Sequence, residues 1–240
     1  MQQRGDIAVG RVQLRVTNTS DTATTLTAAS FTSPVLAGSA EWNAVRPTTL
    51  APGRTVDLPV LLPAIRCTDD AQAPEATFTA DGVTATAPLA DELDVLPRAS
   101  ATACDRDDLA SVVQVRATSA AAGPDGSILM RVAVEPVPEG QGTADLVALR
   151  GTVLLRFAAG AEAPVGLSVA AGDAPSVVEI AVVPQRCDAH AIAEDKVGTL
   201  FDLVARVDGR EVVVPLERSK DVADALLALT AEVCGLTPAR

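Results

Sequence analysis

Hydrophobic and polar residues alternate in short stretches along most of the chain, and clusters of turn-forming residues separate these stretches. Alternation with a period of two is typical of a β-strand that buries one face. The pairs Asp81-Gly82 and Asp208-Gly209 each lie between short alternating runs, which indicates a tight β-hairpin. The pattern therefore predicts an all-β chain. The predicted strands are residues 7–16, 22–31, 55–62, 76–80, 83–87, 109–117, 127–134, 146–157, 165–169, 177–183, 200–207 and 211–214.

A succession of motifs occurs twice. An apolar run reaches a proline and then Arg66-Cys67 or Arg186-Cys187, and an Asp-Gly pair, a Pro-Leu pair and a second cysteine follow in the same order. This succession predicts a duplicated unit, and a length of 240 residues suits two domains of ordinary size. Short strands with regular turns favour tandem immunoglobulin-like β-sandwiches. The expected domains are residues 1–108 and 109–240.

Four cysteines allow three pairings. The duplication favours Cys67 with Cys104 and Cys187 with Cys234, one disulfide in each unit. Such disulfides are typical of oxidising compartments, so we expect an extracytoplasmic protein. Residues 1–10 contain no apolar signal region, and no apolar run reaches the roughly 18 residues of a membrane span. We therefore expect secretion, or an anchor upstream of this chain, and no transmembrane segment within it.

The final segment has a helical period. From Ser219 to Val233 the apolar residues fall mostly on one helical face, and Gly235 follows. The sequence predicts a short C-terminal helix over residues 219–233, beside Cys234. In the first unit Pro97 lies in the corresponding region, so any helix there is expected to be short.

The second unit has a longer connection between its first cysteine and its Asp-Gly pair, with the additional residues near 188–198. This insert predicts a short helix. Asp188 would cap its beginning, Lys196 would lie in its last turn, and Gly198 would end it.

Four residues of this insert form the candidate binding site: Asp188, His190, Glu194 and Asp195. On a helix His190 and Glu194 are neighbours on one face, and imidazole with carboxylates suits zinc-like metals. The alternative is a surface helix with a single His–Glu contact. We favour that alternative because no distant segment visibly supplies further ligands, and metal binding stays open.

Composition restricts the partners. A net charge of −12 argues against nucleic acid and against an anionic membrane surface as partners, because both require a basic footprint.

Catalytic patterns are also missing from the sequence: His190 is the only histidine, disulfides would leave no free thiol, and no G-x-S-x-G, phosphate-loop or dinucleotide glycine motif occurs. We expect no catalytic residue and no cofactor. The alternative is an envelope hydrolase that uses His190 or a pair of carboxylates.

Three segments, Arg186–Phe201, Arg15–Asp21 and Ala51–Arg54, resemble a group of uncharacterised secreted or lipid-anchored actinobacterial proteins. The resemblance extends over most of the chain. It implies export and a tandem of β domains, and it implies no activity and no functional residue.

These observations predict a non-catalytic binding or scaffolding protein of the cell envelope. Loops held on a rigid β frame commonly carry recognition. We expect a protein or another envelope component to contact the second unit near residues 188–196, where the two copies differ by the insert.

Overall fold

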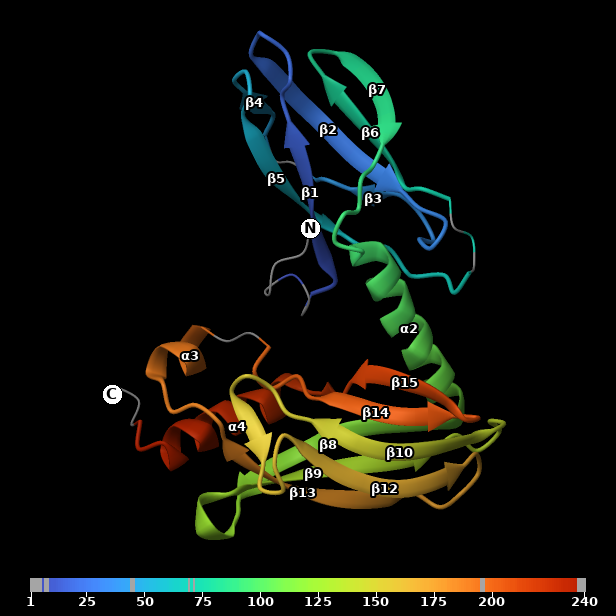
Figure 1. Ribbon diagram of the computed structural model, residues 1–240, viewed down its shortest axis with the longest axis vertical. Coiled ribbons are helices and arrows are strands. Elements are labelled where there is room, and N and C mark those ends of the chain that lie inside the picture. Colours follow the sequence, from blue (N-terminus) through green and yellow to red (C-terminus); the bar gives the residue numbers. More distant parts are fainter. Residues whose placement is uncertain are drawn as a thin grey trace. The chain divides into compact units, whose positions relative to one another are not determined.

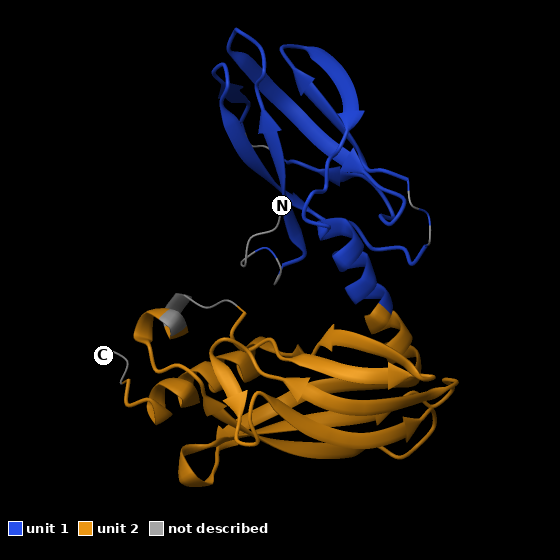
Figure 2. Ribbon diagram, in the orientation of Figure 1, with its two compact units in different colours: residues 1–104 blue, residues 105–240 orange. Residues whose placement is uncertain are grey.

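The computed structural model describes residues 6, 9–43, 46–68, 70, 72–194 and 197–236, with only the backbone of residues 191, 193 and 194. The chain divides into two compact units, residues 1–104 and 105–240 (Figure 2). The division falls inside helix α2 (Val95–Val112). Within the described part of the chain, no helix combines the length and the apolar character needed to cross a membrane.

The first unit consists of two facing sheets (Figure 1). Strand β1 (Arg11–Thr17) pairs antiparallel with β5 (Thr55–Leu61). In the other sheet β2 (Thr24–Thr32) pairs with β6 (Glu75–Ala80), and β6 pairs with β7 (Val83–Pro88). The short strands β3 (Ala40–Glu41) and β4 (Thr48–Leu50) pair with the two ends of β2. The apolar faces of both sheets meet in a core that includes Leu14, Leu26, Phe31, Leu58 and Val60.

The second unit has a four-stranded sheet in the order β12-β10-β14-β15 and a five-stranded sheet in the order β11-β13-β9-β8-β16. Its core contains the buried rings of Phe157 and Phe201, whose centroids lie 5.4 Å apart. The elements are β8 (Val113–Ala122), η1 (Pro124–Gly126), β9 (Ile128–Pro136), β10 (Thr143–Arg150), β11 (Leu155–Phe157), β12 (Glu162–Ala170), β13 (Ser176–Pro184), α3 (Ala189–Glu194), β14 (Asp202–Val207), β15 (Arg210–Pro215), β16 (Glu217–Arg218) and α4 (Lys220–Val233).

Both units share one pattern of pairing. The pair β1-β5 corresponds to β9-β13, and the row β2-β6-β7 corresponds to β10-β14-β15. In each unit a hairpin with an Asp-Gly turn joins the last two strands of that row. Two facing antiparallel sheets of this kind are an immunoglobulin-like sandwich, so the predicted fold class is confirmed. The second unit also has β8 beside β9, for which the described residues of the first unit contain no counterpart.

The predicted disulfides are confirmed. Cys67 is bonded to Cys104 and Cys187 to Cys234, with Cα–Cα distances of 5.6 and 5.3 Å. Cys104 lies within α2, and Cys234 follows α4 directly. The short C-terminal helix is confirmed as well, and the Ser219 hydroxyl caps it by accepting the N–H of Val222 at 3.2 Å.

The prediction of a short helix near Pro97 is wrong, because α2 has 18 residues. Pro97 is the third residue of α2, in the first turn, where the N–H that proline lacks would have no intrahelical acceptor. The carboxylate of Asp91 accepts the free N–H groups of Val95 and Leu96 at 2.9 and 2.8 Å. The helix also takes up residues 109–112 of the predicted strand 109–117, so β8 begins only at Val113.

The single strand predicted over residues 146–157 is also wrong. The chain forms β10, turns after Arg150, and enters the opposite sheet as β11. The Thr152 hydroxyl accepts the N–H groups of Leu154 and Leu155 at 3.1 and 3.0 Å, which fixes the turn. Val153, within this predicted strand, is 49% exposed. The residues predicted as one strand are therefore divided between two sheets.

Candidate functional site

The insert of the second unit begins directly after Cys187. The Asp188 carboxylate accepts the backbone N–H of His190 at 2.9 Å, and the Asp188 carbonyl accepts the N–H of Ile192 at 3.0 Å. Asp188 therefore lies at the beginning of α3, where an acceptor satisfies a free helical N–H. Its other carboxylate oxygen lies 3.5 Å from a guanidinium nitrogen of Arg186.

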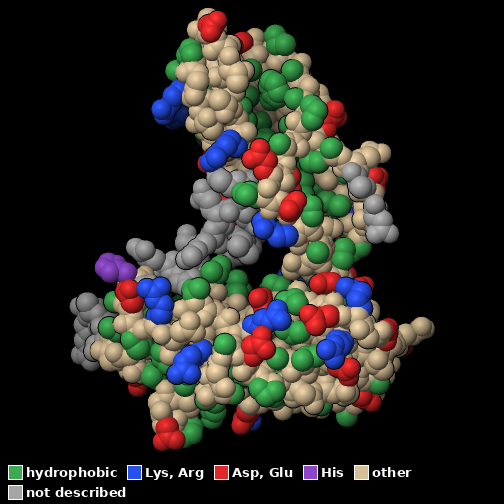
Figure 3. Space-filling model, viewed as in Figure 1, with side chains coloured by type: hydrophobic (Ala, Val, Ile, Leu, Met, Phe, Trp, Pro, Cys, Tyr) green, Lys and Arg blue, Asp and Glu red, His purple; other side chains and the backbone are tan. Residues whose placement is uncertain are grey.

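The disulfide, apolar packing and a hydrogen bond from the Thr152 hydroxyl to the Gly198 carbonyl attach this insert to its unit. Cys187 is bonded to Cys234 at the end of α4, and the partly buried Ile192 packs against the core of the second unit. His190 points to solvent and is the histidine drawn in purple on the surface in Figure 3. Arg186 and the insert residues Asp188 and His190 thus present polar side chains next to the disulfide.

The predicted site is described only in part. The backbone of Glu194 belongs to α3, and the side chain of Glu194 and all of Asp195 and Lys196 lie outside the described residues. Within the described part of the chain, no three His, Cys, Asp or Glu side chains are grouped so that they could hold a metal ion. The His190–Glu194 contact and the metal hypothesis therefore stay predictions.

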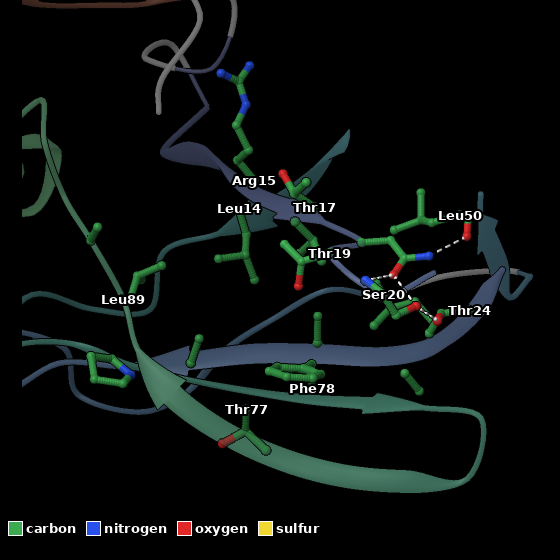
Figure 4. A pocket seen from close by; sticks show the side chains of 18 residues that line it. Leu14, Arg15, Thr17, Thr19, Ser20, Thr24, Leu50, Thr77, Phe78 and Leu89 are labelled. Atoms are coloured by element: carbon green, nitrogen blue, oxygen red, sulfur yellow. Dashed lines mark hydrogen bonds between the residues drawn. The ribbon is translucent and has the colours of Figure 1, made fainter. Parts of the chain in front are cut away.

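The structure contains a second candidate site, a cavity of about 430 Å³ in the first unit (Figure 4). It lies between β1 on one side and β2 and β6 on the other. Leu14 from β1 and Phe78 from β6 point into it, whereas Arg15 points away to the other face of β1. Leu26 and Leu89 complete an apolar lining. We call this cavity the β1 groove.

Polar groups close one end of the β1 groove. The buried Asn18 side chain donates to the carbonyl of Thr22 at 2.8 Å. It also donates to the Leu50 carbonyl at 2.9 Å, and its amide oxygen accepts from the N–H and the hydroxyl of Ser20 at 3.0 and 2.8 Å (Figure 4). These bonds satisfy the amide of Asn18, so the end of the groove is fixed and its polar groups are already engaged.

An ion pair lies behind the groove, on the outer face of β1. The Arg15 guanidinium donates to both carboxylate oxygens of Asp57 on β5, at 2.8 and 3.0 Å. These hydrogen bonds, with a smaller contribution from charge attraction, lower the pKa of Asp57 below its ordinary value. The carboxylate is therefore ionised over a wide pH range and holds Arg15 away from the groove.

The β1 groove was not among the predicted sites. One signal for it exists in the sequence: residues 83–87 alternate Val, Thr, Ala, Thr, Ala, which places small apolar side chains on one face of β7.

Neither a protein-family model nor a curated protein matches the chain. Among solved structures, the chain is similar to one in the CsuC–CsuE chaperone–tip adhesion subunit pre-assembly complex from archaic chaperone-usher Csu pili of Acinetobacter baumannii, with 10% identity, a TM-score of 0.24, and coverage of 88% of this chain and 93% of that chain. It is also similar to the exo-chitosanase CsxA of Amycolatopsis orientalis, with 15% identity, a TM-score of 0.24, and coverage of 85% of this chain and 25% of that one. Likenesses at this level have no bearing on function.

Proposed function

We propose that the protein is a non-catalytic binding or scaffolding component of the cell envelope, outside the cytoplasm. The two disulfides support this, because such bonds persist in oxidising compartments. We also propose that it is secreted or anchored upstream, as in the actinobacterial proteins that it resembles. The common strand order and the two equivalent Asp-Gly hairpins support an origin of both units from one duplicated sandwich.

We infer the binding function from the attachment of the second unit's insert, which follows the Cys187–Cys234 disulfide directly. Its exposed polar side chains stand directly beside a disulfide, on a sandwich with a continuous core. Ordering such a segment in advance reduces the entropy that a partner must overcome on binding. The partner that we propose for it is a protein or another envelope component.

Capture of partners from native envelope extract tests this proposal. The immobilised wild-type chain is compared with a triple variant, Arg186→Ala, Asp188→Asn and His190→Ala, in which Asn preserves the helix cap. The matched control carries Arg131→Ala and Glu179→Ala, which remove an exposed ion pair on β9 and β13. We expect the triple variant to lose captured material that the control retains.

Equal capture by all three chains, at equal melting temperature, would show that the partner does not use the insert. A hydrolytic activity that disappears in His190→Ala would contradict the non-catalytic function. Calorimetric titration of the wild type and His190→Ala with Zn²⁺ addresses the metal hypothesis separately.

A further inference from the structure

One edge of β1 faces no strand within the described part of the chain. On the other edge, the backbone carbonyl of Gly10 accepts the N–H of Leu62, and the backbone N–H of Asn18 donates to the carbonyl of Arg54. The even-numbered residues of β1 are therefore the hydrogen-bonded pairs with β5. Because such pairs alternate along an antiparallel ladder, the backbone groups of Arg15 and Thr17 point away from β5. They form an edge that can pair with a further strand.

The face of β7 on the side of the β1 groove is apolar and exposed. Ala85 pairs with Phe78 of β6 and therefore lies on the same face as this groove-lining ring, and Val83 lies on that face beside Ala80. Val83 is 68% exposed, and Ala85 is exposed too. The other face of β7 carries threonines that hydrogen-bond to threonines of β6. The inward face of β7 thus has the composition of a core surface without a covering layer.

The second unit shows what covers the equivalent surface. Val212 and Val214 of β15, which follow Asp208-Gly209 as Ala85 and Ala87 follow Asp81-Gly82, are only 1% and 4% exposed. Strand β8 runs antiparallel along β9, the counterpart of β1. Its inward residues belong to the core of that unit: Val113, Val115 and Ala117.

We propose that the first unit binds an extended segment of a partner protein, with small apolar residues at every second position, which lies antiparallel along β1 in the β1 groove as β8 lies along β9. Backbone hydrogen bonds to Arg15 and Thr17 would hold the segment, and its alternate side chains would pack between Leu14 and the inward face of β7. This inference rests on the proposed binding function and assigns it a second site and a ligand class.

A second copy of the chain is a poorer occupant of this edge. Each chain has a net charge of −12, which opposes self-association. A partner segment with uncharged side chains facing the groove does not meet this repulsion.

A synthetic peptide with the sequence of residues 113–122 is the direct probe, added to the full-length protein. We expect saturable binding by fluorescence anisotropy, with NMR shifts and slowed hydrogen exchange at the amides of Arg15 and Thr17. The control peptide carries Val113→Asp, Val115→Asp and Ala117→Asp. It should not bind, because burying charged side chains in an apolar groove is unfavourable.

Two variants of the protein separate the edge from the groove. Arg15→Pro removes an outward N–H without disturbing the ladder to β5, and Asp57→Asn controls for the lost ion pair. Ala85→Arg fills the groove from an exposed position, and Thr86→Arg places the same charge on the other face of β7. We expect Arg15→Pro and Ala85→Arg each to weaken peptide binding by about tenfold or more, and both controls to bind within about twofold of wild type.

No saturable binding up to about millimolar peptide would overturn the proposal. Equal binding of both peptides, or shifts at amides away from β1, would overturn it as well. A dimer in sedimentation that Arg15→Pro abolishes, without peptide binding, would assign the edge to a second copy instead. These results are independent of envelope capture through Arg186, Asp188 and His190, so the inference and the proposed function fail separately.

Discussion

At the scale of single residues, Asp208 fixes the last hairpin of the second unit. Its backbone has a φ of 47°, in the left-handed region that Asp tolerates better than most residues. Its carboxylate accepts the N–H of Thr143 at 2.9 Å, and its own N–H donates to the Thr143 carbonyl at 3.0 Å. Asp81 makes the same two bonds with Thr25, each at 3.0 Å. One residue type thus joins each hairpin to the neighbouring strand.

We predict that Asp208→Ala lowers the free energy of unfolding of the second unit by about 2 kcal/mol, because it removes this hydrogen bond and strains the turn. Asp208→Asn keeps a hydrogen-bond acceptor and a residue type that tolerates the left-handed backbone conformation. It should lower the free energy of unfolding by less than half as much. Urea denaturation of both variants measures the difference. Equal losses would mean that the side chain does not contribute through this bond.

A pH dependence follows from the Arg15–Asp57 ion pair. The pKa of Asp57 is lowered in the folded protein, so the ionised carboxylate stabilises the fold above its unfolded pKa of about 3.9, and this contribution is lost as the pH falls through the lower folded value. Asp57→Asn should therefore lower the urea midpoint of the first unit at about pH 7, and this difference should shrink as the pH falls below about 4. A constant difference across this range would contradict the ion-pair explanation, and Arg15→Ala is the matched variant.

At the scale of elements, each disulfide joins the segment after a core strand to a helix. The Cys187–Cys234 bond closes a separation of 47 residues and Cys67–Cys104 one of 37. The chain-entropy model gives a stabilisation of about 4 kcal/mol for loops of these lengths.

We predict that Cys187→Ser with Cys234→Ser lowers the stability of the second unit by about that amount, about 4 kcal/mol, because the unfolded chain gains freedom. Calorimetry should show the change in one transition. Cys67→Ser with Cys104→Ser is the control and should change the other transition. An unaltered transition in the double variant would show that packing alone holds α4.

At the scale of the whole molecule, the two units have separate hydrophobic cores. Leu58 belongs to the first core and Leu226 to the second, and each is at most 2% exposed. Separate cores favour separate cooperative transitions, since a cavity affects mainly the side chains around it.

We predict that Leu58→Ala destabilises the first unit and Leu226→Ala the second, each by about 2–5 kcal/mol. Native-state hydrogen exchange, measured residue by residue, should show lost protection confined to the altered unit. A loss of protection spread over both units in either variant would mean that they unfold as one.

Local sequence patterns were sufficient for several features of this fold. The Asp-Gly turns predicted both final hairpins, the positions of the cysteines predicted both disulfides, and residues 219–233 predicted α4. The same reasoning failed in two places. Pro97 lies in the first turn of α2, where proline does not destabilise a helix. A turn that the Thr152 hydroxyl stabilises divides residues 146–157 between two sheets.

The sequence by itself determined the all-β class, because strand alternation and turn chemistry depend on residues a few positions apart. The repeated order of motifs in turn determined the cysteine pairing. Only the tertiary structure decided which surfaces stay uncovered. Alternation marks the inward face of β7 as apolar, but burial requires a strand from elsewhere in the chain, and β8 provides one only beside β9. The β1 groove therefore depends on whether a strand packs against the inward face of β7, a contact between segments distant in sequence that no local pattern specifies.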